Sequence, residues 1–286
     1  RYFWCGAELM SIMQMLLATS AGGGVNVADL YSTDTWTGDA AFERTITTGL
    51  DMSGQDGIVW SKCRSNPASH SVGNTERNVS KVLLPNTNFS ENTSTAIYKE
   101  YTSTGFKCGN DNAINANGRT YVAWSFLKAE KFFDVVTYTG NGTAGRTVSH
   151  SLGAVPGMIW VKQLDGTSDW ICYHKGLGNT ALVRLNTDGG AQTSSVWNNT
   201  TPTATEFTVG NLNATNGNGN EFIAYLFAED TDNLIKCGDY NGNGGTQTID
   251  CGFQPQFVLI KCFGSGSNDW VVLDSARGTN YLRPNT

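Results

Sequence analysis

Histidine, the side chain that most often transfers protons near neutral pH, occurs only as His70, His150 and His174 in this chain. None of the three stands in an HExxH, GxSxG or Cys/His pattern, the spacings typical of metalloproteases and nucleophilic hydrolases. None recurs at an equivalent place elsewhere in the sequence. The sequence therefore gives no sign of a metalloprotease or of a catalytic triad.

Paired carboxylates could make a glycosidase, because that reaction needs two acids roughly 5 to 9.5 Å apart. The acids nearest to recurrent aromatic residues are Asp165, Asp169, Asp269 and Asp274. Loop carboxylates beside strand ends are usually solvated turn residues, so we predict no enzymatic activity and assign no catalytic residue. Polysaccharide cleavage by these acids is kept as an alternative.

One string matches the opening of an EF-hand calcium loop: Asp239, Asn241, Asn243 and Gly244, with Asp250 in the twelfth place. Its flanks are typical of strands. The matching stretch about 100 residues earlier has Thr137 in place of Asp239, so it lacks the first carboxylate of a calcium loop. We therefore expect a hairpin turn here, and no metal or other cofactor.

Composition limits the partners of the chain. Its 286 residues carry a net charge of −6, and no stretch is basic enough to follow a phosphate backbone, so nucleic acid is excluded as the main ligand. Charged residues make up only 15%, whereas 39% are apolar, enough for a packed core. The 33 glycines, with abundant Asn and Thr, indicate strands and turns rather than helices.

The cysteines stand singly, without a CxxC pair, at Cys5, Cys63, Cys108, Cys172, Cys237, Cys251 and Cys262. This is neither a zinc motif nor a disulfide framework. We expect buried free thiols that pack as small apolar side chains, in a protein made in a reducing compartment.

The most informative feature is a repetition at intervals of about 100 residues, which indicates tandem units. Trp36-Thr37-Gly38, Tyr138-Thr139-Gly140 and Tyr240-Asn241-Gly242 begin 102 residues apart. Apolar runs that end in lysine recur at residues 58–62, 158–162 and 258–261. Asp169-Trp170 returns as Asp269-Trp270, and Pro85-Asn86-Thr87 returns in similar form at residues 185–187 and 284–286.

We divide the chain into residues 1–28, a first unit of residues 29–131, a second unit of residues 132–230 and a third unit of residues 231–286. Runs rich in Val, Ile, Thr and aromatic residues alternate with Gly, Asn and Asp inside a unit, as in strands joined by turns. The expected fold class is all-β: tandem antiparallel β-sandwich repeats of about 100 residues. Jelly-roll and immunoglobulin-like strand orders are both left open.

The aromatic runs at residues 121–126 and 222–227 are apolar on both faces, so they should lie in the middle of packed sheets. Asn117-Gly118 and Asn218-Gly219 fit type I′ hairpin turns. Trp60, Trp124 and Trp160 are expected in the core. For Trp4, Trp36 and Trp197 a core position and a sugar-stacking position are both left open, and the Asn-rich loops at 110–118 and 211–220 are candidate glycan contacts.

The third unit ends before the aromatic strand that closes the other two, so alone it would expose sheet edges and apolar faces. We therefore expect either a chain that continues past residue 286 or a neighbouring chain that supplies the missing strands.

Residues 6–20 break the β pattern, because Leu9, Ile12, Met13, Leu16 and Leu17 fall at helical spacing before Gly22-Gly23-Gly24. The sequence predicts an N-terminal amphipathic helix of roughly 22 Å, too short to cross the ~30 Å hydrocarbon layer of a membrane. A glycine joint favours docking of this helix onto a separate partner over packing against the first unit. The predicted assembly anchor comprises Phe3, Trp4, Leu9, Met10, Ile12, Met13, Leu16 and Leu17.

Several longer motifs carry a family resemblance: Phe3-Trp4-Cys5-Gly6-Ala7 and residues 138–142, 156–162, 222–228 and 274–278. Across essentially the whole chain, this pattern resembles repeat-containing tail-fibre or virion structural proteins of tailed bacteriophages, notably phages of aquatic bacteria. The first unit departs from it, with His70 where the other units have tryptophan and with residues 74–77 in place of the Asp-Ser-Ala-Arg run.

The resemblance implies a non-enzymatic virion structural protein, made in the host bacterial cytoplasm and assembled as a homotrimer. We expect the proximal part of a tail fibre, in which the helix binds phage tail or adaptor proteins, stacked units form a stalk and a distal part contacts a host surface glycan. The alternatives are a capsid decoration protein and a carbohydrate-binding or carbohydrate-cleaving fibre.

Overall fold

A computed structural model describes residues 10–18, 26–264 and 266–286. The predicted all-β class is confirmed, because the described residues form several antiparallel sheets. Helical structure in this part of the chain is limited to the 3₁₀ turn η1 (Val27–Asp29) and the short helix α1 (Asn213–Asn216).

The first unit has two sheets, with strand orders β2-β10-β4-β5-β6-β7 and β3-β9-β8. Their strands are β2 (Tyr31–Thr37), β3 (Arg44–Thr47), β4 (Gly57–Cys63), β5 (Ser71–Asn74), β6 (Lys81–Leu83), β7 (Asn92–Thr93), β8 (Tyr98–Thr102), β9 (Gly105–Cys108) and β10 (Thr120–Leu127). The sheets pack through Trp36 and Phe106, whose ring centroids are 6.2 Å apart. The buried Tyr98 hydroxyl also lies 3.1 Å from the Val59 carbonyl oxygen, which ties β8 to β4.

The second unit repeats this arrangement with the orders β11-β18-β13-β14-β15-β16 and β12-β17. Its strands are β11 (Phe133–Thr139), β12 (Arg146–Ser149), β13 (Pro156–Gln163), β14 (Ile171–His174), β15 (Ala181–Arg184), β16 (Gln192–Thr193), β17 (Glu206–Val209) and β18 (Glu221–Ala228). Tyr138 and Phe207 take the places of Trp36 and Phe106, again with ring centroids 6.2 Å apart.

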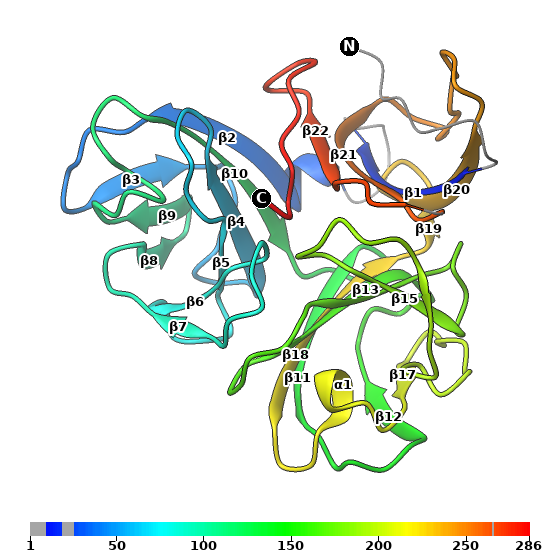
Figure 1. The fold of residues 1–286 in the computed structure, drawn as a ribbon. Helices are drawn as coiled ribbons and strands as arrows, with labels where there is room; N and C mark the ends of the chain where they lie inside the picture. Colours follow the sequence, from blue (N-terminus) through cyan, green and yellow to red (C-terminus); the bar gives the residue numbers. More distant parts are fainter. Residues whose placement is uncertain (1–9, 19–25, 265) are drawn as a thin grey trace.

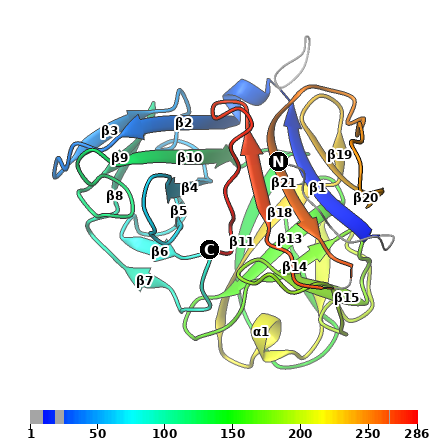
Figure 2. The same ribbon diagram turned by 45° about the horizontal axis from the view of Figure 1, so that its top comes forward.

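The third unit contributes β20 (Ile235–Gly242), β21 (Pro255–Cys262) and β22 (Val271–Asp274) to a single sheet, together with β19 (Asp230–Thr231) at its boundary with the second unit. The order of that sheet is β19-β20-β1-β21-β22, so its middle strand is β1 (Met10–Ala18) from the start of the chain. Figure 2 shows β1 in blue between β20 and β21. No counterpart of the smaller sheets occurs among the described residues of the third unit.

The predicted N-terminal helix is wrong for residues 10–18, which form β1. This strand is antiparallel to both neighbours; Ile12, for example, pairs with Tyr240 of β20 and with Cys262 of β21. In a short apolar run, the spacing of apolar residues alone cannot distinguish a helix from a strand. Here the run forms a strand because it pairs with the edges of both β20 and β21. The other residues of the predicted helix lie outside the described residues.

β1 also changes the expectation for the third unit. The position that β10 and β18 fill in the first two units is filled here by the chain's own first strand, and not by a neighbouring chain. The registers correspond closely: Trp36 pairs with Tyr121, Tyr138 with Phe222 and Tyr240 with Ile12. Residues 36, 138 and 240 therefore occupy like positions in the three larger sheets.

The three units surround a common centre (Figure 1), and the first unit touches the third as well as the second. The expected stalk of stacked units is therefore wrong. In a stalk of stacked units, each unit contacts only its neighbours in the sequence. Here the third unit also contacts the first.

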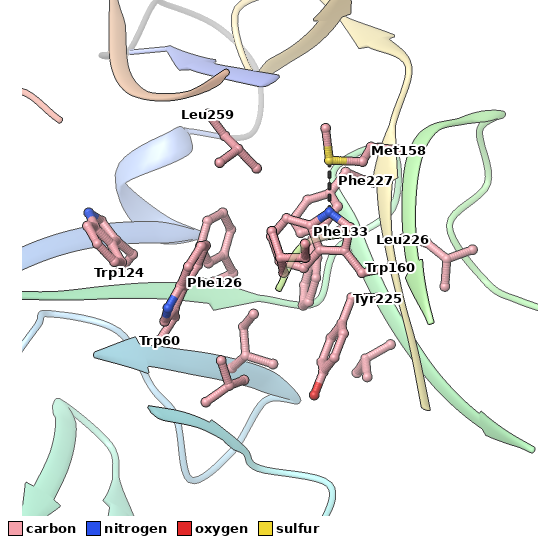
Figure 3. Packing of buried hydrophobic residues seen from close by; sticks show 14 of the residues in the cluster. Trp60, Trp124, Phe126, Phe133, Met158, Trp160, Tyr225, Leu226, Phe227 and Leu259 are labelled. Atoms are coloured by element: carbon pink, nitrogen blue, oxygen red, sulfur yellow. Dashed lines mark hydrogen bonds between the residues drawn. The ribbon is translucent and has the colours of Figure 1, made fainter. Parts of the chain in front are cut away.

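Buried apolar residues from all three units form one core at this centre (Figure 3). Trp60 of the first unit meets Trp160 of the second edge to face, with ring centroids 5.7 Å apart. Phe126 contacts Phe227 of the second unit and Phe257 of the third, at 5.9 and 5.7 Å. Trp60, Trp124 and Trp160 are thus core residues, as predicted, and the aromatic strands β10 and β18 are interior strands, each paired on both sides.

The two Asn-Gly pairs do not form type I′ hairpins. Gly118 and Gly219 have φ values of +73° and +78°, whereas neither preceding asparagine has a positive φ, as type I′ would require. A positive φ at the glycine alone is typical of a type II turn. Each turn leads from a smaller sheet to a larger one, so it does not join two paired strands.

Removal of residues 1–18 should release the third sheet, because β20 and β21 pair with β1 and not with each other. We expect the amides of β20, β21 and β22 to lose hydrogen-exchange protection, whereas β10 and β18 keep theirs. Removal of residues 1–9 retains β1 and serves as the control. Unchanged protection after the longer deletion would contradict the assigned role of β1.

Candidate functional site

The recurrent Asp-Trp and Pro-Asn-Thr motifs meet in pairs at the edges of the units. Asn186 accepts a hydrogen bond from the Trp170 backbone N–H at 2.9 Å and donates one to Asp169 at 2.9 Å. Asn285 holds Trp270 and Asp269 in the same way, at 3.0 and 2.8 Å. In each case one amide side chain fixes the loop that presents a tryptophan ring.

The ring at this position then donates to the next unit. Trp170 Nε1 donates to the carbonyl oxygen of Leu84 in the first unit at 3.2 Å, and Trp270 Nε1 donates to that of Arg184 in the second at 2.8 Å. His70 stands at the same place in the first unit, and its Nε2 lies 3.0 Å from the carbonyl oxygen of Arg283 in the third. These bonds close a ring: second unit to first, third to second, and first to third.

Two of the three lysines that end the apolar runs also donate across the junctions. Lys62 Nζ donates to the carbonyl oxygen of Thr286 in the third unit at 3.1 Å, and Lys261 Nζ donates to that of Asp188 in the second at 2.7 Å. Lys162 Nζ donates to the carbonyl oxygen of its neighbour Gln163 at 2.7 Å. Burial lowers the pKa of Lys162 to about 8, although Asp169 and Asp165 act in the opposite direction.

The four acids considered for glycoside hydrolysis are each held by neighbours. Asp165 accepts from Gln163 Nε2 and from the Glu221 N–H, at 3.0 and 3.1 Å. Asp169 and Asp269 form ion pairs with Arg184 and Arg283 in addition to their asparagine contacts. The non-enzymatic prediction is not tested by these contacts, but they give each of these carboxylates a structural role.

Asp274 is the most deeply buried of the four acids. Its Oδ2 atom accepts from Arg277 Nε at 2.6 Å and from Trp124 Nε1 of the first unit at 2.8 Å. The side chains of Asp274 and Arg277 are 0% and 1% exposed. A buried ion pair of this kind survives only when its remaining hydrogen-bonding groups are satisfied, and Trp124 contributes to that across the junction.

The calcium-loop string is split between a strand and a loop. Asp239 and Asn241 lie on β20 and pair with Met13 and Ser11 of β1, and only then does the chain turn. A calcium loop instead wraps its early ligands around the ion. Across residues 10–18, 26–264 and 266–286, no group of three or more His, Cys, Asp or Glu side chains is placed to hold a metal ion.

The other candidate residues also have structural contacts. Trp36 and Trp197 are buried, with their indole N–H groups bonded to the Ile114 and Ala181 carbonyl oxygens; Trp4 lies outside the described residues. Asn115 and Asn216, from the two Asn-rich loops, are fully buried and hydrogen-bond the turns that follow β2 and β11. The six described cysteines are buried and none forms a disulfide, which fits the predicted packing as small apolar side chains.

Of the predicted anchor residues, Met10, Ile12, Met13, Leu16 and Leu17 belong to β1, while Phe3, Trp4 and Leu9 lie outside the described residues. Their backbone completes a sheet, and the anchoring role itself stays a prediction. No helix within the described ranges is long and apolar enough to cross a membrane.

The first unit contains a pocket of about 430 Å³ that sequence reasoning missed. It is lined by Met52, Ser53, Gly54, Gln55, Asp56, Thr75, Arg77, Val79, Lys99, Glu100 and Tyr101. Two of its charged groups form ion pairs within the protein: Arg77 with Glu91, and Glu100 with Lys107 at 2.7 Å. The Lys99 ammonium lies 3.8 Å from the centre of the Phe42 ring.

The pocket offers few free groups to a ligand. The hydroxyl oxygen of Tyr101, a lining residue, is buried without a hydrogen-bond partner, and burial raises the pKa of Tyr101 well above its usual value. The only sequence signal was the departure of residues 74–77 from the Asp-Ser-Ala-Arg run. The junctions, rather than this pocket, are where the recurrent chemistry-bearing residues gather.

Replacing Asn186 with leucine should destabilise the protein by roughly 1–3 kcal/mol, because the buried Trp170 N–H and one Asp169 oxygen lose their partner. Urea unfolding measures the effect. The matched control is Asn110→Leu, at an exposed loop position, where we expect a change within about 0.5 kcal/mol. Equal free energies of unfolding for the two variants would contradict the role of Asn186 in holding Trp170 and Asp169.

Replacing Lys162 with methionine should change the pH dependence of stability. Because the pKa of Lys162 is about 8 in the folded protein and about 10.4 in an unfolded chain, the folded state binds fewer protons between these values. The wild type should therefore gain stability as the pH rises from 8 to 10, and the variant should gain less. Urea unfolding at pH 7, 8, 9 and 10 tests this, with the exposed Lys131→Met as the control.

Comparison with known proteins gives a family for the chain but no described function. No curated protein and no solved structure matches it. A family described as "Domain of unknown function (DUF7483)" matches residues 26–285, which include all three units. Because this match covers most of the chain, the protein belongs to the DUF7483 family.

Proposed function

We propose that this protein is a non-enzymatic structural component of a bacteriophage virion, most specifically part of a tail fibre that supports host attachment. One observation carries the proposal: the recurrent polar residues join the units to one another. Asn186, Trp170 and Leu84 illustrate this, as a chain of contacts that crosses a junction. Scaffolding uses its hydrogen-bonding groups internally in this way, whereas a catalytic cleft presents some of them to a substrate.

We infer that the three units are copies of one module, a tandem β-sandwich repeat. The equal registers of residues 36, 138 and 240 support this, as do the matching two-sheet contacts of Trp36 and Tyr138. The described residues of the third copy contribute strands to the larger sheet. Copies of one module pack around a centre when each offers the same face to its neighbour.

A closed block of three units suits a particle component better than three modules on flexible joints would. Every unit touches both others, so local opening of one unit must break contacts in two directions. In the proposed fibre the chain forms a homotrimer, binds tail or adaptor proteins, and leaves host glycan contact to a distal part. It would be made in the cytoplasm of the host bacterium.

The proposal predicts that the chain is present in purified virions and confined to the tail. Gold-labelled antibodies raised against the full chain should decorate the tail in electron micrographs. An antibody to the major head protein of the same virions serves as the control. Absence of the chain from particles would reject the proposal.

Two other results would favour the alternatives. Label spread over the head would indicate a capsid decoration protein. Release of sugar products from host polysaccharide, lost in Asp169→Asn or Asp269→Asn but not in Asn110→Leu, would indicate a depolymerase. Because the first two changes also weaken junctions, each variant must be shown to be folded before its activity is compared.

A further inference from the structure

One junction differs chemically from the other two. The ring that donates across it is His70, whereas Trp170 and Trp270 occupy the equivalent places. The backbone N–H of His70 is held by Asn86 at 3.1 Å, just as Asn186 and Asn285 hold the tryptophans. His70 joins the first unit to the third, so it lies where the series of units closes on itself.

The hydrogen bonds of His70 fix its protonation state. A carbonyl oxygen can only accept, so Nε2 carries the proton that it donates to Arg283, 3.0 Å away. Nδ1 accepts from the indole N–H of Trp60, also at 3.0 Å. His70 is 0% exposed, so neither nitrogen is open to bulk solvent. The folded junction therefore contains the neutral ring.

The surroundings of His70 oppose a second proton. The charged groups that act on it are Lys62 from β4 and Arg277 from the turn after β22, and both are cations. The nearby carboxylates are already engaged, Asp269 with Arg283 and Asp274 with Arg277. Burial and, next, the charge of Lys62 hold the pKa of His70 well below 6.5.

We propose that His70 makes the junction between the first and third units an acid-sensitive latch. A proton added at Nδ1 would point at the Trp60 N–H and place a third cation beside Lys62 and Arg277. To take up the proton the ring must leave this position, which breaks its bond to Arg283. The junctions at Trp170 and Trp270 contain no titrating ring, so acid opens one junction of the three.

The lowered pKa of His70 determines how the stability of the junction changes with pH. Because the folded-state pKa is below the unfolded value of about 6.5, the open junction binds the proton more readily than the closed one. Stability of the junction is complete above that pH and falls as the pH drops below it. The equilibrium constant for opening should rise up to about tenfold per pH unit until the folded-state pKa is passed.

Hydrogen exchange of the full chain between pH 7.5 and 5, corrected for the intrinsic rate, tests the proposal at segments 68–74 and 280–286. Segments 168–174 and 268–272 report on the other junctions. The His70→Gln variant keeps a donor and an acceptor but cannot titrate. The double variant Ile58→Met/His70→Trp copies the second unit, in which Met158 Sδ accepts from the Trp160 indole N–H at 3.0 Å.

His150 is a buried histidine that lies within one unit, so His150→Gln serves as the control variant. In the wild type and in this control, we expect hydrogen-exchange protection at the first-to-third junction to fall with acid, while the other two junctions keep their protection. In the His70 variants it should not fall. The proposal is overturned if the wild-type junction stays protected down to pH 5. It is also overturned if either folded His70 variant loses protection over the same pH range as the wild type.

Discussion

The structure depends on the burial of a face that no unit can cover alone. Trp60, Trp160 and Phe257 project from three different sheets into one core, and each is almost fully excluded from water. Burying one such side chain contributes about 1.5–3 kcal/mol, whereas a junction hydrogen bond contributes about 1 kcal/mol. Apolar burial therefore holds the units together, and the hydrogen bonds of Trp170, Trp270 and His70 decide how they are aligned.

This need to cover an apolar face explains why the first strand of the chain pairs within the sheet of the third unit. A third unit without its middle strand would leave β20 and β21 as two unpaired edges beside the core, and each edge is a site for pairing with another molecule. β1 removes both edges together, since it pairs with β20 on one side and β21 on the other. The partners Ile12 and Cys262 are near opposite ends of the sequence, so this sheet depends on pairing between distant segments, which slows folding.

Much of the fold was predictable, because strands and turns are local and the repetition aligns equivalent residues. The two apolar faces of β10 and β18 predict interior strands, and the apolar runs around Trp60 and Trp160 predict core positions; the structure confirms both. β1 was not predictable as a strand, since its partners are more than 200 residues away and its spacing suits a helix equally well. The roles of Asp169 and Asp269 were also hidden, because sequence does not show that an asparagine sixteen or seventeen residues later binds them.

His70 illustrates how one residue can be required by packing and still be able to titrate. The indole N–H of Trp60 is buried, and an unpaired buried donor costs about 1–3 kcal/mol. In the second unit the sulfur of Met158 satisfies the equivalent tryptophan, but Ile58 stands at that place in the first unit and offers no acceptor. A tryptophan at position 70 could bond Arg283 but would leave Trp60 unpaired. Histidine satisfies both groups, and it does so only while it is neutral, so the requirement for an acceptor is also the reason that this junction responds to acid.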